Sequence, residues 1–314
     1  MPLHPEARRI IERGSAESSG QAPPLDAQAM REEFRRAWRM PDDLPPVAGV
    51  ADTTAPGPAG EIPVRVYTPE GAGPFPVLVW FHGGGWTIGT LDENEYSCRA
   101  VCAAAGAVVV SVDYRLAPEH PYPAAVEDCY AAVSWVHDQA AALAADPGRI
   151  AVGGESAGGN LAAVVALKAR DLGGPGIRLQ VLVSPVVGHS GDGRASYADY
   201  ADGYFLSASA MEWFFTQYPR DARDLADPYL LPLRATDLSG LPRALVLEAE
   251  YDVLRDEGEA YARALKDAGV AVELVHFDGL IHGFFGLLAS ELTDAARAHA
   301  EVVRALRSAC GEGR

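Results

Sequence analysis

The sequence contains no run of about 18 consecutive apolar residues, the shortest length that spans a membrane as a helix. It also contains no cluster of basic residues with interleaved aromatic residues. It contains 26 Lys and Arg but 43 Asp and Glu, so the formal net charge at pH 7 is −17. Because such a surface repels nucleic acid and anionic membranes, we expect neither nucleic-acid binding nor stable insertion into a membrane.

Cysteine is scarce, and its positions are uninformative. The four cysteines, Cys98, Cys102, Cys129 and Cys310, follow no spacing that is typical of a disulfide framework or a metal site. Residues 1–13 are charged and lack the apolar core of a secretory signal. We therefore expect a cytoplasmic protein without a metal site.

The sequence does contain a regular alternation of apolar runs and helical patterns. Its 314 residues, 48% of them hydrophobic, are enough for one large α/β domain with an added subdomain. A turn rich in proline and glycine predicts a hairpin of two strands. Six further apolar runs do not alternate with polar residues, which is typical of parallel strands buried on both faces. The expected strands are 47–54, 62–68, 77–81, 107–112, 150–153, 179–184, 244–249 and 272–277.

Helical patterns fill the intervals between these runs. Repeated alternation of strand and helix predicts an α/β fold with a mostly parallel eight-stranded sheet, flanked by helices on both faces. No internal repeat suggests a solenoid or a propeller instead. The expected helices are 92–105, 124–144, 157–172, 256–268 and 293–308.

Two stretches do not fit this alternation. Residues 25–40 form a helical pattern in which Met30, Phe34 and Trp38 share an apolar face. That face is equally consistent with ordinary docking against the body of the protein and with a lid over a pocket. Residues 186–241 contain no buried strand but an aromatic helical segment, and an insertion of that length is usually functional. Together the two stretches predict a helical cap.

The residues around Ser156 carry the strongest local signal. A predicted strand leads into Ser156, and a predicted helix follows it directly. Gly154 and Gly158 lie two positions to either side, where a side chain would collide in so sharp a turn. Such a turn lifts the hydroxyl above the sheet edge, at the positive end of the following helix, which suits a nucleophile. The alternatives are a serine in an ordinary glycine-rich turn and a loop that cradles phosphate.

A second glycine motif follows the predicted strand 77–81. Residues 82–86 read His-Gly-Gly-Gly-Trp, and glycines leave backbone N–H groups free to approach a ligand closely. With the N–H group of Ala157, this loop offers three donors for a developing oxyanion. The alternative is a flexible glycine turn, which explains neither the adjacent histidine nor the position directly after a strand.

The segment 113–120 follows the next predicted strand and reads Asp-Tyr-Arg-Leu-Ala-Pro-Glu-His. We expect Asp113, Arg115 and Glu119 to pair and to fix this segment against the glycine loop. The expected role of the segment is structural, and His120 receives no chemical role.

A serine nucleophile needs a base, and the base needs a carboxylate that orients it. Of the eight histidines, His282 lies in the loop after the last predicted strand, whereas His276 lies within that strand and would project from its face. Asp252 stands just past another predicted strand. The carboxyl ends of parallel strands meet at one edge of a sheet. We therefore expect Ser156, Asp252 and His282 to come together at that edge.

These motifs together resemble the hormone-sensitive-lipase-like branch of the α/β-hydrolases, the bacterial carboxylesterases. The resemblance covers residues 45–310 and implies an α/β-hydrolase fold with a helical cap. Residues 46–187 and 231–314 would form the core, and residues 1–45 and 188–230 the cap. The matching stretches, in the order of that family, are 82–86 (HGGGW), 113–119 (DYRLAPE), 154–159 (GESAGG), 252–257 (DVLRDE) and 282–284 (HGF).

The resemblance also assigns catalytic roles. It implies that Ser156 is the nucleophile, that His282 is the general base and then the acid, and that Asp252 orients His282. Most members of the family have Asp before the serine, where this sequence has Glu155. Since neither acid belongs to the triad, we expect only a local change in hydrogen bonding.

The same resemblance implies that the backbone N–H groups of Gly84, Gly85 and Ala157 form the oxyanion hole. Aromatic residues of the predicted cap favour a compact apolar pocket for the acyl chain. The side chains expected to bind the substrate are Phe34, Trp86, Tyr204, Met211, Phe214 and Phe285.

We therefore expect a serine carboxylesterase that hydrolyses short- to medium-chain esters through an acyl-enzyme, without a cofactor or a metal. One alternative is the same triad acting on lactones, amides or carbamates, or in acyl transfer. Another is a non-catalytic ligand receptor on this fold, but related plant hormone receptors lack the histidine that this sequence retains as His282. A homodimer through an exposed edge strand, as in relatives, is left open.

Overall fold

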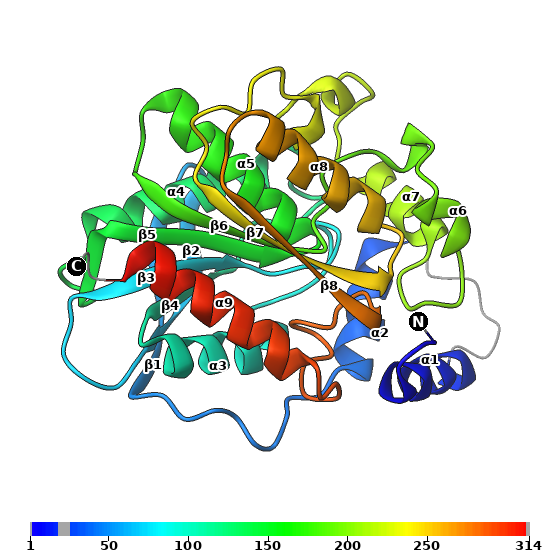
Figure 1. The fold of residues 1–314 in the computed structure, drawn as a ribbon, viewed down its shortest axis with the longest axis horizontal. Coiled ribbons are helices and arrows are strands. Elements are labelled where there is room, and N and C mark those ends of the chain that lie inside the picture. The colour runs from blue at the N-terminus through cyan, green and yellow to red at the C-terminus, as the bar shows by residue number, and fades with distance from the viewer. Residues whose placement is uncertain (1, 18–25, 312–314) are drawn as a thin grey trace.

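The computed structural model describes residues 2–17 and 26–311. Its centre is an eight-stranded sheet with the order β1-β2-β4-β3-β5-β6-β7-β8 (Figure 1). β1 and β2 form an antiparallel hairpin at one edge, and the strands from β3 to β8 run parallel. The strands are β1 Gly49–Gly57, β2 Gly60–Thr68, β3 Phe75–Phe81, β4 Val108–Val112, β5 Ala145–Glu155, β6 Ile177–Val183, β7 Arg243–Tyr251 and β8 Val272–Ile281.

Helices cover both faces of the sheet. Side chains along β4 alternate between two apolar layers, with Val108, Val110 and Val112 in one and Val109 in the other. The first layer lies under α4, α5 and α8, and the second under α3 and α9 (Figure 1). These helices are α3 Glu95–Ala105, α4 Ala124–Asp138, α5 Ala157–Leu172, α8 Arg255–Asp267 and α9 Ala295–Cys310.

The remaining helices gather beyond the ends toward which the parallel strands point (Figure 1). The backbone N–H of His4, just before α1, donates to the carbonyl of Gly279 at 2.9 Å. Arg31 of α2 donates to the carbonyls of Thr87 at 2.8 Å and Ala117 at 2.7 Å, which fixes that helix over the loops that follow β3 and β4. These helices are α1 Pro5–Glu17, α2 Ala27–Ala37, α6 Ser196–Asp199 and α7 Ala208–Gln217.

The predicted fold class is confirmed, and the differences are confined to the ends of elements. The hairpin turn is shorter than expected, because Gly57 pairs directly with Gly60 and Pro56 with Glu61. A proline is compatible with β1 because this strand lies at the sheet edge, where a missing N–H donor costs little. The expected helix 124–144 ends at Asp138, and turns lead from there into β5.

The cysteines behave as apolar side chains. All four are free and buried. Cys98 and Cys102 of α3 contact the layer under α9, and burial raises the pKa of the Cys102 thiol to about 12. A thiol that stays protonated is a poor nucleophile, so these residues have no expected chemical role.

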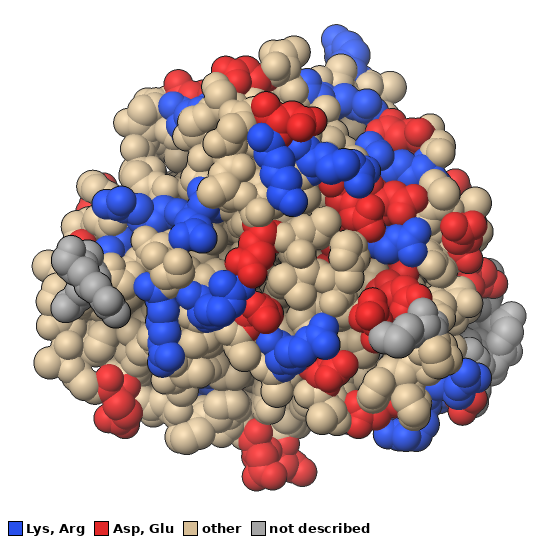
Figure 2. Space-filling model, viewed as in Figure 1, with Lys and Arg blue, Asp and Glu red and all other residues tan. Residues whose placement is uncertain are grey.

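The surface carries charges of both signs. On the face that Figure 2 shows, basic and acidic side chains are interspersed, although the formal net charge is −17. Arg304 of α9, for example, pairs with Glu273 of β8 and with Glu301. No helix among residues 2–17 and 26–311 combines the length and the apolar character of a membrane span.

Candidate active site

Ser156 occupies a sharp turn between β5 and α5. Its backbone has φ 60° and ψ −122°, a conformation that a non-glycine residue adopts only when its surroundings enforce it. The neighbouring glycines explain how the turn closes. A Cβ atom at Gly154 would lie 2.3 Å from the carbonyl carbon of Gly158, and one at Gly158 would lie 2.0 Å from the carbonyl oxygen of Phe81. The expected collision of side chains at these two positions is therefore the reason for both glycines.

Asp252 and His282 are in direct contact. Asp252 directly follows β7, and His282 directly follows β8. The Nδ1–H group of His282 donates to Oδ2 of Asp252 at 2.7 Å, and the Leu254 N–H donates to Oδ1 at 2.9 Å. Both side chains are buried. The bond fixes the ring with Nε2 as the nitrogen that can accept a proton.

The electrostatic surroundings favour the protonated form of His282. Burial by itself lowers the pKa of the ring, but the carboxylate of Asp252, and to a smaller extent that of Glu155, outweighs this effect. The net result is a pKa above the ordinary value for histidine. A more basic imidazole is a stronger proton acceptor, but it also becomes protonated, and so unable to accept, at a higher pH.

Glu155 connects the turn at Ser156 to the loop that carries His282. One carboxylate oxygen accepts the N–H of Phe285 and the other accepts the N–H of Gly286, both at 3.1 Å. Burial raises the pKa of Glu155, while His282 and these two bonds act in the opposite direction. The departure from Asp at this position thus places a longer carboxylate where it holds two backbone groups of the histidine loop.

The glycine loop after β3 has a conformation that only glycine adopts readily. Gly84 has φ +109° and Gly85 has φ +55°. A Cβ atom at Gly84 would lie 2.2 Å from the carbonyl oxygen of Ile88, and one at Gly85 would lie 2.2 Å from the ring of Phe214. The glycine loop is therefore in close contact with the backbone of Ile88 on one side and with Phe214 of the cap helix α7 on the other. Ala157 opens α5, where a backbone N–H has no acceptor within the helix.

Two aromatic side chains fix the start of the glycine loop. The ring of His82 stacks on Tyr114 at 4.3 Å, and its Nδ1–H group donates to the carbonyl of Gly83 at 2.7 Å. The hydroxyl of Tyr114 donates to the carbonyl of His82 at 2.8 Å. Because the C=O of residue 83 and the N–H of residue 84 point in opposite directions across a trans peptide, holding this carbonyl also aims the next N–H group.

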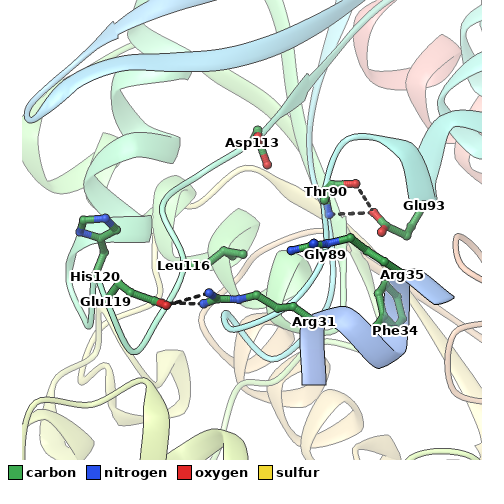
Figure 3. A pocket seen from close by; sticks show the side chains of 10 residues that line it. All are labelled: Arg31, Phe34, Arg35, Gly89, Thr90, Glu93, Asp113, Leu116, Glu119 and His120. Carbon is green, nitrogen blue, oxygen red and sulfur yellow. Dashed lines mark hydrogen bonds and ion pairs between the residues drawn. The ribbon is translucent and has the colours of Figure 1, made fainter. Parts of the chain in front are cut away.

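Phe34 lines a cavity of about 430 Å³ beside the glycine loop. In Figure 3, Arg35 reaches into this cavity from α2, and Asp113 lies on the opposite wall. None of the three expected triad residues lines it. The cavity is open to solvent on one side and is lined by Arg31, Phe34, Arg35, Gly89, Thr90, Glu93, Asp113, Leu116, Glu119 and His120.

The other cap residues expected to bind the substrate are Met211, Phe214 and Tyr204, none of which lines this cavity. Met211 and Phe214 are buried on α7, and Phe214 is the residue that covers Gly85. Tyr204 stacks on Tyr251 at 5.0 Å. The structure tests none of these three as a substrate contact, so they stay predictions.

Phe205, which the sequence pattern does not single out, lies beside the loop that carries His282. Its side chain is 48% exposed and its φ is +74°, both uncommon for an aromatic residue. Its ring would lie 3.4 Å from a Cβ atom at Gly283, the residue after His282. Phe205 differs from its neighbour Tyr204 in its solvent-exposed position beside the histidine loop.

Two further residues expected to contact the substrate, Phe285 and Trp86, pack in the core. Phe285 points to the opposite layer, where its ring stacks on Trp80 at 5.0 Å and meets His299 edge-on at 4.6 Å. Trp86 is fully buried and stacks on Tyr218 at 4.3 Å. Trp86 ends one loop motif and Phe285 follows another, and a loop pattern does not determine the direction of a side chain.

Trp86 instead takes part in a junction at Asn160, which was not predicted. Trp86 Nε1–H donates to Oδ1 of Asn160 at 3.2 Å. The Asn160 Nδ2 group donates to the carbonyls of Val186 and Leu230, each at 2.8 Å. One buried amide of α5 therefore joins the glycine loop to both ends of the cap insertion.

The expected ion pairs of the segment 113–120 have other partners. Arg115 pairs with Asp128 of α4 at 2.8 Å, and Glu119 pairs with Arg31 of α2 at 2.6 Å. Burial raises the pKa of Asp113, which faces the cavity. The structural role of the segment holds, but it fixes α2 and α4 rather than pairing with itself.

Comparison with known proteins identifies relatives that hydrolyse esters, and the matches cover most of the chain. A family model described as alpha/beta hydrolase fold matches residues 78–286. The chain is 51% identical over 265 residues to carboxylic ester hydrolase LipN of Mycobacterium tuberculosis, covering 80% of this chain and 70% of LipN. It is 37% identical over 326 residues to ethyl acetate hydrolase of Pseudomonas putida, covering 98% and 99%. A solved esterase of the archaeon Pyrobaculum calidifontis superposes with a TM-score of 0.93 at 43% identity, covering 98% and 99%.

Proposed function

The chain belongs to the hormone-sensitive-lipase-like branch of the α/β-hydrolase family and is a serine carboxylesterase, and we propose that Ser156, Asp252 and His282 are its catalytic triad. The observation that supports this assignment most strongly is the 2.7 Å bond between His282 and Asp252. This bond supports His282 as the oriented base, because Asp252 and His282 follow parallel strands that end at the same sheet edge as the turn of Ser156. No other described histidine is bonded to a carboxylate that directly follows a strand of the sheet.

In the proposed acylation step, Oγ of Ser156 attacks the ester carbonyl while Nε2 of His282 takes its proton. Asp252 stabilises the imidazolium that results. The N–H groups of Gly84, Gly85 and Ala157 donate hydrogen bonds to the negatively charged carbonyl oxygen. One such donor stabilises the transition state by roughly 2.7–4 kcal/mol. His282 then gives its proton to the departing alcohol, which leaves an acyl group on Ser156.

In the proposed deacylation step, water takes the place of the alcohol. His282 accepts a proton from this water, which attacks the acyl carbonyl, and the same three N–H groups meet the second oxyanion. The proton then returns to Oγ of Ser156, and the carboxylic acid is released. The cycle is balanced without an electron transfer or a further reactant.

We propose that the preferred acyl chains are short to medium. Phe214 of α7 covers Gly85 closely, and Met211 is buried on the same helix, an arrangement that favours a small acyl group. The name of one relative, ethyl acetate hydrolase, also refers to a small ester. The expected substrate is therefore a compact neutral ester.

A series of p-nitrophenyl esters from acetate through butyrate and octanoate to palmitate tests this proposal. We expect kcat/KM to be highest between acetate and octanoate and to fall for palmitate. A maximum at palmitate would contradict the assignment of the acyl pocket. Inert nitrophenyl esters together with turnover of a lactone, an amide or a carbamate would favour a different substrate for the same triad.

We propose that residues 1–45 and 188–230 form a cap over the core of residues 46–187 and 231–314. Arg31 supports this division, because it fixes α2 to the loops after β3 and β4. β1 and β8 are the two sheet edges, and a homodimer through an exposed edge is a prediction that light scattering can test. The cytoplasmic location also stays a prediction.

A further inference from the structure

The main chain of Phe285 is held from two sides. Its N–H donates to Glu155, as described above, and its carbonyl oxygen accepts the hydroxyl of Ser97 at 2.5 Å. The same carbonyl lies 3.0 Å from Nε2 of His299. Phe285 stands three positions after His282, so these bonds fix the loop that carries the proposed base.

Ser97 and His299 come from two different helices. Ser97 lies on α3 and His299 on α9, and these helices run side by side on the face of the sheet that is turned toward the viewer in Figure 1. Both side chains are buried, and Nε2 of His299 lies 3.0 Å from Oγ of Ser97. Burial lowers the pKa of His299 to about 4, so at pH 7 the ring is neutral and carries one N–H group.

The tautomer of His299 follows from its neighbours. The carbonyl of Phe285 can only accept hydrogen bonds, so Nε2 of His299 is the nitrogen that carries the proton. Two donors, a hydroxyl and an imidazole, therefore converge on one carbonyl oxygen. Both side chains thus bond to the backbone of a loop outside the helices that carry them.

The surrounding packing leaves this loop little freedom. A Cβ atom at Gly286 would lie 2.5 Å from Oδ1 of Asn94 and 2.7 Å from Oε2 of Glu155. Oδ1 of Asn94 in turn accepts the Nε1–H of Trp80 at 3.0 Å, and the Trp80 ring stacks on Phe285. Sterics, stacking and hydrogen bonds thus specify one position for the backbone of the loop.

We propose that Ser97 and His299 are positioning residues for the hydrolysis, which hold the carbonyl of Phe285 so that His282 stays aligned with Asp252 and Ser156. The inference rests on the proposed role of His282. A displacement of about 1 Å in a catalytic group can reduce the rate about 100-fold. Loss of both donors would also leave a buried carbonyl without a partner, which the loop can relieve only by moving.

The test compares His299→Gln with His299→Met. The two substitutions have similar length, but only glutamine keeps an N–H donor near the position of Nε2. With p-nitrophenyl butyrate, well below the lowest Tm of the set, we expect kcat to fall roughly 10- to 100-fold in His299→Met with KM nearly unchanged. His299→Gln should recover most of the loss, which a role in packing alone would not produce.

Ser97→Ala and the double variant with His299→Met extend the test. Each donor supplies part of the restraint on the carbonyl, so we expect the double variant to lose more activity than either single variant. Ser97→Ala removes a single oxygen atom and keeps the proposal testable if His299→Met does not fold. A kcat within twofold of wild type in both Ser97→Ala and His299→Met would overturn the proposal.

A measurement without substrate separates this inference from the proposed function. The Nδ1 proton of His282, in its short bond to Asp252, should give a downfield NMR resonance, identified by its absence in His282→Gln. We expect this resonance to broaden or shift in the double variant. An inactive wild-type protein would refute the proposed function, whereas an unchanged resonance and an unchanged kcat in the double variant would refute only the role of Ser97 and His299.

Discussion

The loop that carries His282 and the cap segment that carries Phe205 are neighbours, but they are held in different ways. In the histidine loop, the N–H and the carbonyl of Phe285 both bond to buried side chains. In the cap segment, Tyr204 stacks on Tyr251 and Phe205 is 48% exposed. The first segment is fixed by directional bonds in the interior, the second by ring contacts near solvent.

This difference matches the demands on the two segments. Proton transfer tolerates errors of only a fraction of an ångström, so the groups that perform it need fixed partners. Recognition of an acyl or alcohol group by apolar contact tolerates movement. The ion pair between Arg31 of α2 and Glu119 is also near solvent, because the side chain of Glu119 is half-exposed. Exposed ion pairs of this kind contribute little to the free energy of unfolding.

Asp252→Asn should have the largest effect among substitutions beside Ser156. The asparagine amide would favour the wrong tautomer of His282 and could not stabilise the imidazolium, so we expect kcat to fall on the order of 10⁴-fold. Asp256→Asn, four residues further on, is the matched control and should stay within about tenfold of wild type. Stopped-assay kinetics with p-nitrophenyl butyrate measure both. An equal loss of kcat in the two variants would contradict the assignment of Asp252 as the carboxylate that orients His282.

Gly85→Ala should have the next largest effect, because Gly85 lies in the glycine loop and contacts Phe214 of the cap helix α7. The new methyl group would collide with Phe214, and φ +55° is unfavourable for alanine. We expect a loss of about 10²–10³-fold in kcat, as for removal of one oxyanion donor. Gly106→Ala has a similar φ of +64° with open space around it, so it should lower Tm without lowering kcat. Unchanged kcat in Gly85→Ala would show that this loop does not bind the oxyanion.

Glu155→Gln should lower kcat about tenfold, because an amide cannot accept both N–H groups of the histidine loop. It should also move the acid limb of the pH–rate profile. Activity is lost as pH falls through the pKa of His282, and the charge of Glu155 raises that pKa. Removing the charge should therefore shift the limb to lower pH. Glu70→Gln, on an exposed residue after β2, is the control, and a limb that stays in place in Glu155→Gln would contradict the electrostatic coupling.

Phe34→Ala should have the smallest effect on the chemistry. The cavity beside α2 would widen, so we expect the ratio of kcat/KM for octanoate over acetate to rise by less than about tenfold, with kcat for acetate nearly unchanged. Leu172→Ala, on an exposed residue at the end of α5, is the control. A large loss of kcat for acetate in Phe34→Ala would mean that the cap takes part in the chemistry itself.

The order of the strands' residues in the sequence predicts which residues directly follow the parallel strands and so lie at one edge of the sheet. Non-alternating apolar runs identify the parallel strands, and Asp252 and His282 each directly follow one of them. Any such residues must meet at one edge, because a parallel sheet has all its carboxyl ends on one side. Glycine spacing likewise identified the turn at Ser156, since only glycine tolerates the contacts on either side.

Side-chain direction within loops was not predictable. Phe285 and Phe205 are both aromatic residues in loops, but the first faces the core under α9 and the second faces solvent. Nothing in the local pattern separates them, because loops have no fixed periodicity. The partners of Arg115 and Glu119 were also missed, since an ion pair between distant segments depends on how helices pack against loops.

The most direct test of the central claim is covalent labelling by a p-nitrophenyl alkylphosphonate, with the adduct mapped by peptide mass spectrometry. The account predicts one adduct on Ser156, formed rapidly in the wild-type protein. It predicts no adduct in Ser156→Ala and a reaction slowed on the order of 10⁴-fold in His282→Gln. An adduct on another serine, or a rate in His282→Gln equal to that of wild type, would contradict it.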